Sequence, residues 1–282
     1  MIAEDIRRSR IVSKEKWVEA RRSHLAKEKE HTRQRDELAR ERRELPWVKV
    51  DQDYVFDAPQ GKVALAGLFG AHSQLLVYHF MFGPDWAEGC PSCSFVCDHL
   101  NGATPHLAAR DVSLVMVSRA ALPKIEAFKQ RMGWQFPWVS SHGNSFNHDF
   151  HVYFTPEEKA RGEVYYNYTM QPFPSDEAPG ASVFYKDPQT GEIFHTYSTF
   201  GRGLDTMVGT YVLLDLVPKG RDEDRLPFAM QWVRHHDRYN VSGGDAFADA
   251  DKPYWPEVAA AEVAPAAGET SSCCRGGLEK NP

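Results

Sequence analysis

The chain has 282 residues, of which 42% are hydrophobic and 12% aromatic, enough to bury a core without help from disulfides or metal ions. Its formal net charge of −6 provides no basic field for a polyanion, which argues against nucleic acid as a partner of the whole chain. The first residues lack the apolar stretch of a secretory signal and no apolar run reaches bilayer length, so we expect a cytoplasmic protein with no membrane association.

Residues 13–45 are predicted to form one long helix. Ser13 suits the N-cap, the interior is rich in Glu, Lys, Arg and Ala, and Pro46 ends it. The segment up to Pro46 holds 14 basic and 10 acidic residues, a balance that fits an exposed, ion-paired helix better than a nucleic-acid arm. Its sparse apolar residues include Trp17 and Leu38, which are candidates for contact with the rest of the chain or, in a homodimer, with a second subunit.

The chain then alternates apolar strands with helices. A β-rich entry at residues 47–56 precedes two strand candidates, residues 73–80 and 113–118. Residues 91–107, between them, have a composition compatible with a helix, and a further helix after the second strand ends at Gly133. This alternation predicts an α/β protein with a central sheet covered by helices.

The second half of the chain adds antiparallel strands. Residues 181–185 and 192–197 flank a turn and predict a hairpin, which makes the sheet mixed. Residues 205–216 and 225–239 are predicted closing helices. Residues 150–179 are rich in Tyr, Pro and Glu, fit neither the helical nor the strand period, and are interpreted as an insertion.

We therefore predict three parts. Residues 1–46 form the charged N-terminal helix, and residues 47–241 form one α/β domain with the insertion inside it. Residues 242–282, rich in Ala, Pro, Asp and Glu, are predicted to be a disordered tail.

The cysteines carry the first functional signal. There are five, namely Cys90, Cys93, Cys97, Cys273 and Cys274. An odd number in a reducing compartment argues against a structural disulfide framework. Clustered cysteines in such a compartment are more often redox-active or metal-binding.

The sequence Cys90-Pro91-Ser92-Cys93 follows a strand and a loop and begins a predicted helix. A thiol attacks a disulfide only as the thiolate, and the free N–H groups and dipole at a helix N-terminus lower the pKa of a thiol. Pro91 suits the first helical position, where its missing donor costs nothing. We predict Cys90 as the outer, attacking sulfur and Cys93, one turn on, as the resolving sulfur.

A metal site is the alternative interpretation of these cysteines. Cys97 and His99 follow on the same helix, but no second Cys-x-x-Cys or His pair stands at a usable spacing. Cys97 lies on an apolar face and is more simply a small packed hydrophobe. We therefore expect no metal and no cofactor. The adjacent cysteines of the tail could exchange thiols, capture metal, or have no function.

Other polar residues near the motif have simple explanations. Asp85 and Glu88 would oppose thiolate formation or, if buried, shuttle the proton of Cys93, but both are most simply solvated loop residues. Trp86 would cover the active sulfur or belong to the core. Three histidines are interpreted as structural, namely His79, His142 and His148.

Five segments resemble one known family. They are residues 78–94 (Tyr-His-Phe-Met-Phe-Gly-Pro-Asp-Trp-Ala-Glu-Gly-Cys-Pro-Ser-Cys-Ser), 131–141, 183–187, 194–198 and 215–220. In these segments the chain is similar to the uncharacterised thioredoxin-like family of predicted dithiol-disulfide oxidoreductases (domain-of-unknown-function family 899), over about residues 17–239. The resemblance implies a thioredoxin-like fold and places Cys90 and Cys93 at the cysteine positions of that family. It implies a thiol or disulfide of a protein or small molecule as substrate, but no established target.

Two features depart from the wider thioredoxin pattern. A cis-proline usually precedes the strand that leads into the hairpin, whereas here Pro179 is expected two residues too early, before Ala181. Peroxiredoxins carry Pro-x-x-x-Thr/Ser-x-x-Cys, and the matching positions before the first cysteine are Gly83 and Ala87.

The sequence thus favours a thiol–disulfide oxidoreductase that cycles a Cys90–Cys93 disulfide. A peroxiredoxin-like peroxide reductase that uses Cys90 is one alternative. A non-catalytic metal-binding protein or metallochaperone is the other.

Overall fold

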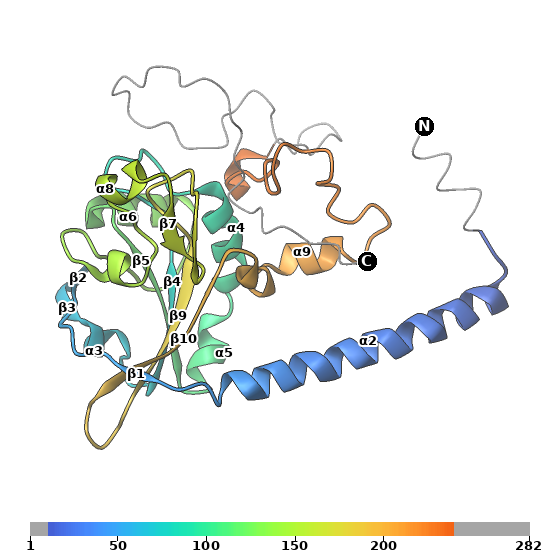
Figure 1. Ribbon diagram of the computed structural model, residues 1–282, viewed down its shortest axis with the longest axis horizontal. Coiled ribbons are helices and arrows are strands. Elements are labelled where there is room, and N and C mark those ends of the chain that lie inside the picture. The colour runs from blue at the N-terminus through green and yellow to red at the C-terminus, as the bar shows by residue number, and fades with distance from the viewer. Residues whose placement is uncertain (1–10, 240–282) are drawn as a thin grey trace. The chain divides into compact units, whose positions relative to one another are not determined.

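The computed structural model describes residues 11–239 of the chain (Figure 1). These residues separate into two compact units, with the boundary between Pro46 and Trp47. The predicted tail, residues 242–282, lies outside the described residues together with its two cysteines. Within residues 11–239 no helix is long and apolar enough to cross a membrane.

The first unit is helix α2, Lys14–Arg42, close to the predicted range. Ser13 has an extended backbone at the N-cap, and its hydroxyl accepts a hydrogen bond from the N–H of Lys16 at 3.4 Å. Arginine–glutamate pairs one turn apart line its surface. No side chain of α2 is buried, and Trp17 and Leu38 are 58% and 60% exposed. A homodimer through this helix stays a prediction.

The second unit is built on one mixed sheet of eight strands, in the order β1-β10-β9-β4-β5-β6-β2-β3. Its strands are β1 (Val48–Lys49), β2 (Val55–Ala58), β3 (Gly61–Ala64), β4 (Gln74–His79), β5 (Val112–Ser118), β6 (Trp138–Ser140), β9 (Gly180–Lys186) and β10 (Ile193–Phe200). Strands β4, β5 and β6 run parallel, whereas β9 pairs antiparallel with both β4 and β10. The predicted parallel part and the predicted hairpin are both confirmed.

The helices connect and cover this sheet. They are α3 (Leu65–Leu68), α4 (Pro91–Leu100), α5 (Thr104–Ala108), α6 (Leu122–Arg131), α7 (Phe146–Asp149), α8 (Pro156–Ala160) and α9 (Gly209–Leu214). The unit β4–α4–β5 followed by the β9–β10 hairpin, with the sheet order β5-β4-β9-β10, is the arrangement of the thioredoxin-like fold. The predicted fold class is confirmed.

Alternating side chains of the central strands fill two cores. On β4, Tyr78 enters one apolar cluster, as does Phe80 directly after the strand, and Leu75 and Val77 enter the other. Helices α4, α6 and α9 contribute to the first cluster, and α3 and α7 to the second. Figure 1 shows α4 and α9 on one side of the central strands and α3 on the other. Both faces are therefore covered, which explains the continuous apolar sequence of the central strands.

The proposed insertion has local structure that the sequence did not predict. It contains α8 and a separate two-stranded sheet, β7 (Val164–Tyr166) with β8 (Thr169–Gln171). Its aromatic side chains pack in a third apolar cluster. Strand β9 begins at Gly180, so Pro179 directly precedes the strand and the expected offset of two residues is wrong. No cis peptide bond occurs within the described residues.

Two predicted helices differ from the structure. The helix expected over 91–107 breaks after Leu100, because Pro105 has no N–H and its ring would clash with the carbonyl of Asn101. The helix expected over 225–239 is wrong, since only a 3-10 turn, His236–Arg238, forms there. Met230 has a φ of +68°, in the left-handed region that a right-handed helix cannot contain.

The second core gives a test of the fold. The ring of Phe146 is fully buried and packs edge-on against Tyr54 and Phe56, with centroids 4.9 and 5.0 Å away. We expect Phe146→Ala to lower the free energy of unfolding by about 3–5 kcal/mol, because the cavity adds to the lost transfer energy. Tyr165→Ala, at an aromatic residue that is 42% exposed, should cost less than about 1 kcal/mol. Urea unfolding compares the two, and equal costs would contradict this packing.

Candidate functional site: the Cys90–Cys93 dithiol

The dithiol stands where α4 begins, as predicted. Cys90 is the N-cap, with φ −56° and ψ 130°, and Pro91 opens the helix. The carbonyl of Cys90 accepts the first helical hydrogen bond, from the N–H of Ser94 at 2.9 Å. Cys93 therefore lies on the first turn, and its sulfur comes back toward that of Cys90.

The two sulfurs differ in acidity. A hydrogen bond from the Cys93 thiol is the main cause that lowers the pKa of Cys90. The backbone N–H groups of Cys93 and Ser92 act in the same direction, and burial opposes them. Burial raises the pKa of Cys93 well above its usual value, and the hydrogen bond to Cys90 raises it further. Cys90 is thus the sulfur that ionises first, as expected of an attacking thiol.

Two groups, one on β4 and one just after it, form hydrogen bonds with the Cys93 sulfur. The N–H of Met81 donates to Sγ at 3.4 Å. Tyr78 is buried, and its hydroxyl forms a hydrogen bond with the Cys93 side chain that lowers the pKa of that thiol. Tyr78 was not predicted as a residue of the site, although the alternation of β4 places it on the face that α4 covers.

Neither sulfur is open to solvent in this conformation. Cys90 and Cys93 are each 1% exposed, and both belong to the first apolar cluster. The structure therefore does not present Cys90 as the outer sulfur that the sequence predicted. A partner could reach it only after part of its cover moves.

Cys97 and the possible metal ligands around it are accounted for by packing. Cys97 is fully buried, and burial raises the pKa of its thiol well above the usual range. His99 contacts the carbonyl of Phe95 through Nδ1 at 2.7 Å, and Nε2 lies 2.8 Å from the Thr210 hydroxyl. Among the described residues no group of three or more His, Cys, Asp or Glu side chains could hold a metal ion.

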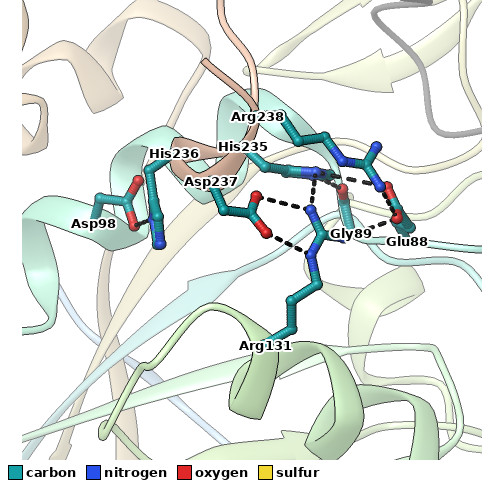
Figure 2. Close-up of polar contacts among 8 residues, drawn as sticks. All are labelled: Glu88, Gly89, Asp98, Arg131, His235, His236, Asp237 and Arg238. Atoms are coloured by element: carbon teal, nitrogen blue, oxygen red, sulfur yellow. Dashed lines mark hydrogen bonds and ion pairs between the residues drawn. The ribbon is translucent and has the colours of Figure 1, made fainter. Parts of the chain in front are cut away.

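The two acids before the motif differ from each other. Asp85 is exposed, as expected for a solvated loop residue. Glu88 is not simply solvated: its carboxylate accepts hydrogen bonds from Arg131 at 2.8 Å and from Arg238 (Figure 2). The same interpretation is therefore wrong for Glu88, because the arginines that bind it are distant in sequence. Trp86 packs against the cluster that holds both cysteines.

Residues 230–238, which we call the strap, lie against the motif. Val233 is fully buried in the same cluster as the two sulfurs, and the Trp232 ring lies 5.5 Å from that of Phe95 on α4. Nε2 of His235 lies 2.8 Å from the carbonyl oxygen of Gly89, the residue before Cys90. Figure 2 shows the His235 side chain pointing from the strap toward Gly89.

A buried glutamate lies near the loop that connects β4 to Cys90. Glu177 is 1% exposed, and Nη1 of Arg119 approaches its Oε1 at 2.7 Å. Burial raises the pKa of Glu177 to about 8, although Arg119 opposes the shift. A Cβ built on Gly83 would lie 3.5 Å from that carboxylate and 2.9 Å from the Trp86 ring. Burial therefore favours the protonated form of this carboxyl group, which lies beside the loop that leads to the dithiol.

The three histidines named from the sequence do not join the dithiol. His79 is fully buried on the opposite face of the sheet, where Nε2 contacts the Ser182 hydroxyl at 2.8 Å, and burial lowers its pKa to about 3. His142 contacts the carbonyl of Arg119, and His148 contacts Glu158.

Comparisons with known proteins add a family and no chemistry. A model of the family described as "Bacterial protein of unknown function (DUF899)" matches residues 6–239, whereas no curated protein matches the chain. A mutant of peroxiredoxin Q from Xanthomonas campestris is 14% identical over 60% of this chain and 98% of that chain, with a TM-score of 0.39. Peroxidoxin BcpB from Mycobacterium tuberculosis is 13% identical over 59% and 95%, with a TM-score of 0.36. At such values neither similarity bears on the chemistry of this chain.

The hydroxyl of Tyr78 gives a test of the dithiol geometry. Tyr78→Phe removes one hydrogen bond to the ionised form of Cys93, so that form becomes harder to reach. In a Cys90→Ser background we expect alkylation of Cys93 at pH 9 to slow about tenfold, the effect of one hydrogen bond to a charged group. The matched control is Tyr211→Phe, which removes a hydroxyl that donates to Glu223. Peptide mass spectrometry reads the rate, and an unchanged rate in Tyr78→Phe would contradict the contact.

Glu177 gives a pH-dependent test. Its pKa of about 8 in the folded state exceeds the ordinary value, so the folded chain binds the extra proton. The stabilisation present at low pH is therefore lost as the pH rises toward 8. Relative to Glu177→Gln, which has no such proton, the wild type should lose about 2–4 kcal/mol of unfolding free energy between pH 5 and 8. Urea unfolding at both pH values measures the difference. A constant difference would place the carboxylate in its charged form throughout.

Proposed function

The chain belongs to the family described as bacterial protein of unknown function (DUF899), and because that description leaves the activity open, we propose from the site itself that the protein is a thiol–disulfide oxidoreductase. One observation carries the proposal. Two cysteines meet at the head of α4, and the thiol of Cys93 donates a hydrogen bond that lowers the pKa of Cys90. An attacking sulfur and its resolving partner need this asymmetry.

The proposed reaction balances within the dithiol and one disulfide. The Cys90 thiolate attacks a substrate disulfide, forms a mixed disulfide and releases one substrate thiolate. Cys93 then loses its proton and attacks Cys90 Sγ, which breaks the mixed disulfide and releases the second thiolate. Two electrons pass from the dithiol to the substrate, and the reverse sequence oxidises a substrate dithiol.

Different donor groups stabilise the thiolate that forms in each of the two steps. Helix N–H groups stabilise the first thiolate, which forms at the N-cap. The second thiolate forms at Cys93, where Tyr78 and the N–H of Met81 are the donors that compensate part of the cost of burial. The substrate class is a disulfide or dithiol of a protein or small molecule. The proposed compartment is the cytoplasm, where the glutathione pool would regenerate the dithiol.

A redox titration against glutathione tests this proposal. We expect Cys90 and Cys93 to form one reversible intramolecular disulfide with a single two-electron midpoint, identified by thiol labelling and peptide mass spectrometry. Cys90→Ser should abolish disulfide-reductase activity. Cys97→Ala is the matched control, because it removes a buried sulfur one turn further along the same helix and should leave turnover within about twofold.

Three outcomes would contradict the proposal. A Cys90→Ser protein that keeps full reductase activity would exclude the mechanism. Rapid peroxide consumption with a sulfenic acid on Cys90 would favour the peroxide-reductase alternative. Metal bound stoichiometrically to protein purified without additions, with no disulfide formed, would favour the metal-binding alternative.

A further inference from the structure

We propose that the strap, residues 230–238, is an autoinhibitory cover that must lift before a disulfide substrate can reach Cys90. This inference concerns regulation of the same site and rests on the proposed function. It starts from the burial of both sulfurs, each 1% exposed. Thiol–disulfide exchange requires the attacking sulfur to approach along the substrate S–S bond, and this conformation leaves no room for that approach.

The strap contacts both helix α4 and the residue that precedes Cys90. Val233 enters the cluster that contains Cys90 and Cys93, and Trp232 lies against Phe95 of α4. His235 bonds to the carbonyl of Gly89, directly before the attacking cysteine. Strap and dithiol therefore share one packed surface, although they are far apart in the sequence.

The His235 contact has a defined proton arrangement. Nη2 of Arg131 faces Nδ1 of His235 at 3.3 Å and can only donate, so Nδ1 accepts. The proton of the neutral ring is therefore on Nε2, from which it is donated to the Gly89 carbonyl. This hydrogen bond links the strap backbone to the loop that positions Cys90.

Charged side chains fasten the strap at its end (Figure 2). Arg131 of α6 donates twice to Asp237, at 2.8 and 2.9 Å, and once to Glu88. Arg238 donates to the same Glu88 carboxylate, and Nδ1 of His236 lies 2.7 Å from Asp98 of α4. Glu88 stands two residues before Cys90, so these ion pairs connect the strap directly to the loop that precedes Cys90.

The ion pairs that hold the strap can dissociate without unfolding of the domain. Glu88 and Asp237 keep 22% and 35% of their side-chain surface exposed, so water can replace the ion pairs at modest cost. Within the described residues the strap pairs with no strand of the sheet and has only one 3-10 turn. Val233 is fully buried, but the partly exposed ion pairs and the lack of pairing with a strand are features of a segment that opens locally.

The test measures access to Cys90 and needs no enzymatic activity. The double variant Asp237→Asn/Arg238→Gln removes the strap's ion pairs with Arg131 and Glu88, leaves the His236–Asp98 contact in place, and alters no residue between Glu88 and Cys90. We expect alkylation of Cys90 by iodoacetamide to become at least about tenfold faster, read by peptide mass spectrometry. Cys97 is fully buried on the same helix and reports global unfolding, so its rate should stay unchanged.

The matched control is Asp57→Asn/Lys62→Gln, which removes an ion pair between β2 and β3. It should leave the rate at Cys90 unchanged. Equal rates at Cys90 in the strap variant and the wild type would overturn the inference, as would parallel increases at Cys90 and Cys97. If Cys90 becomes accessible but forms no disulfide with Cys93, the strap stands and the proposed function fails.

Discussion

Hydrogen bonds between the end of β4 and the beginning of α4 fix the geometry on which the site depends. The carbonyl of Met81 accepts from the N–H of Cys90 at 3.0 Å, and the N–H of Met81 donates to the Cys93 sulfur at 3.4 Å. Met81, two residues after the end of the strand, therefore ties both cysteines of the first helical turn to the segment that leaves β4. The strand is itself held between β5 and β9, so the dithiol has a rigid base.

Burial and reactivity oppose each other at this site. Removing a thiolate from water raises its pKa, yet the same low dielectric strengthens each hydrogen bond and dipole that stabilises the charge. Cys90 has the helix N–H groups and the Cys93 thiol as donors, and its pKa falls despite burial. Cys93 has fewer compensating groups, and its pKa rises. The order in which the two sulfurs ionise thus follows from their donors and not from their exposure, which is the same for both.

Local signals in the sequence predict the parts of the site that depend on neighbours along the chain. The apolar run of β4, the position of Pro91 and the spacing of the cysteines are enough to place the dithiol at a helix start. The contacts of Glu88 with Arg131 and Arg238 join residues 43 and 150 positions apart, and no local pattern contains them. Residues 225–239 look helical by composition, but burial of Val233 and the backbone of Met230 override that propensity.

The charge on Glu88 connects the position of the strap to the ionisation of the Cys90 thiol. A lone carboxylate two residues before a thiol would oppose its ionisation. With the strap in place, Arg131 and Arg238 compensate that charge while the sulfur is hidden. When the strap lifts, Arg238 leaves with it, but water enters and screens the carboxylate, and Arg131 stays because it belongs to α6. The arginine on α6 therefore compensates the Glu88 carboxylate in both positions of the strap, so the loss of Arg238 on opening leaves that charge still paired.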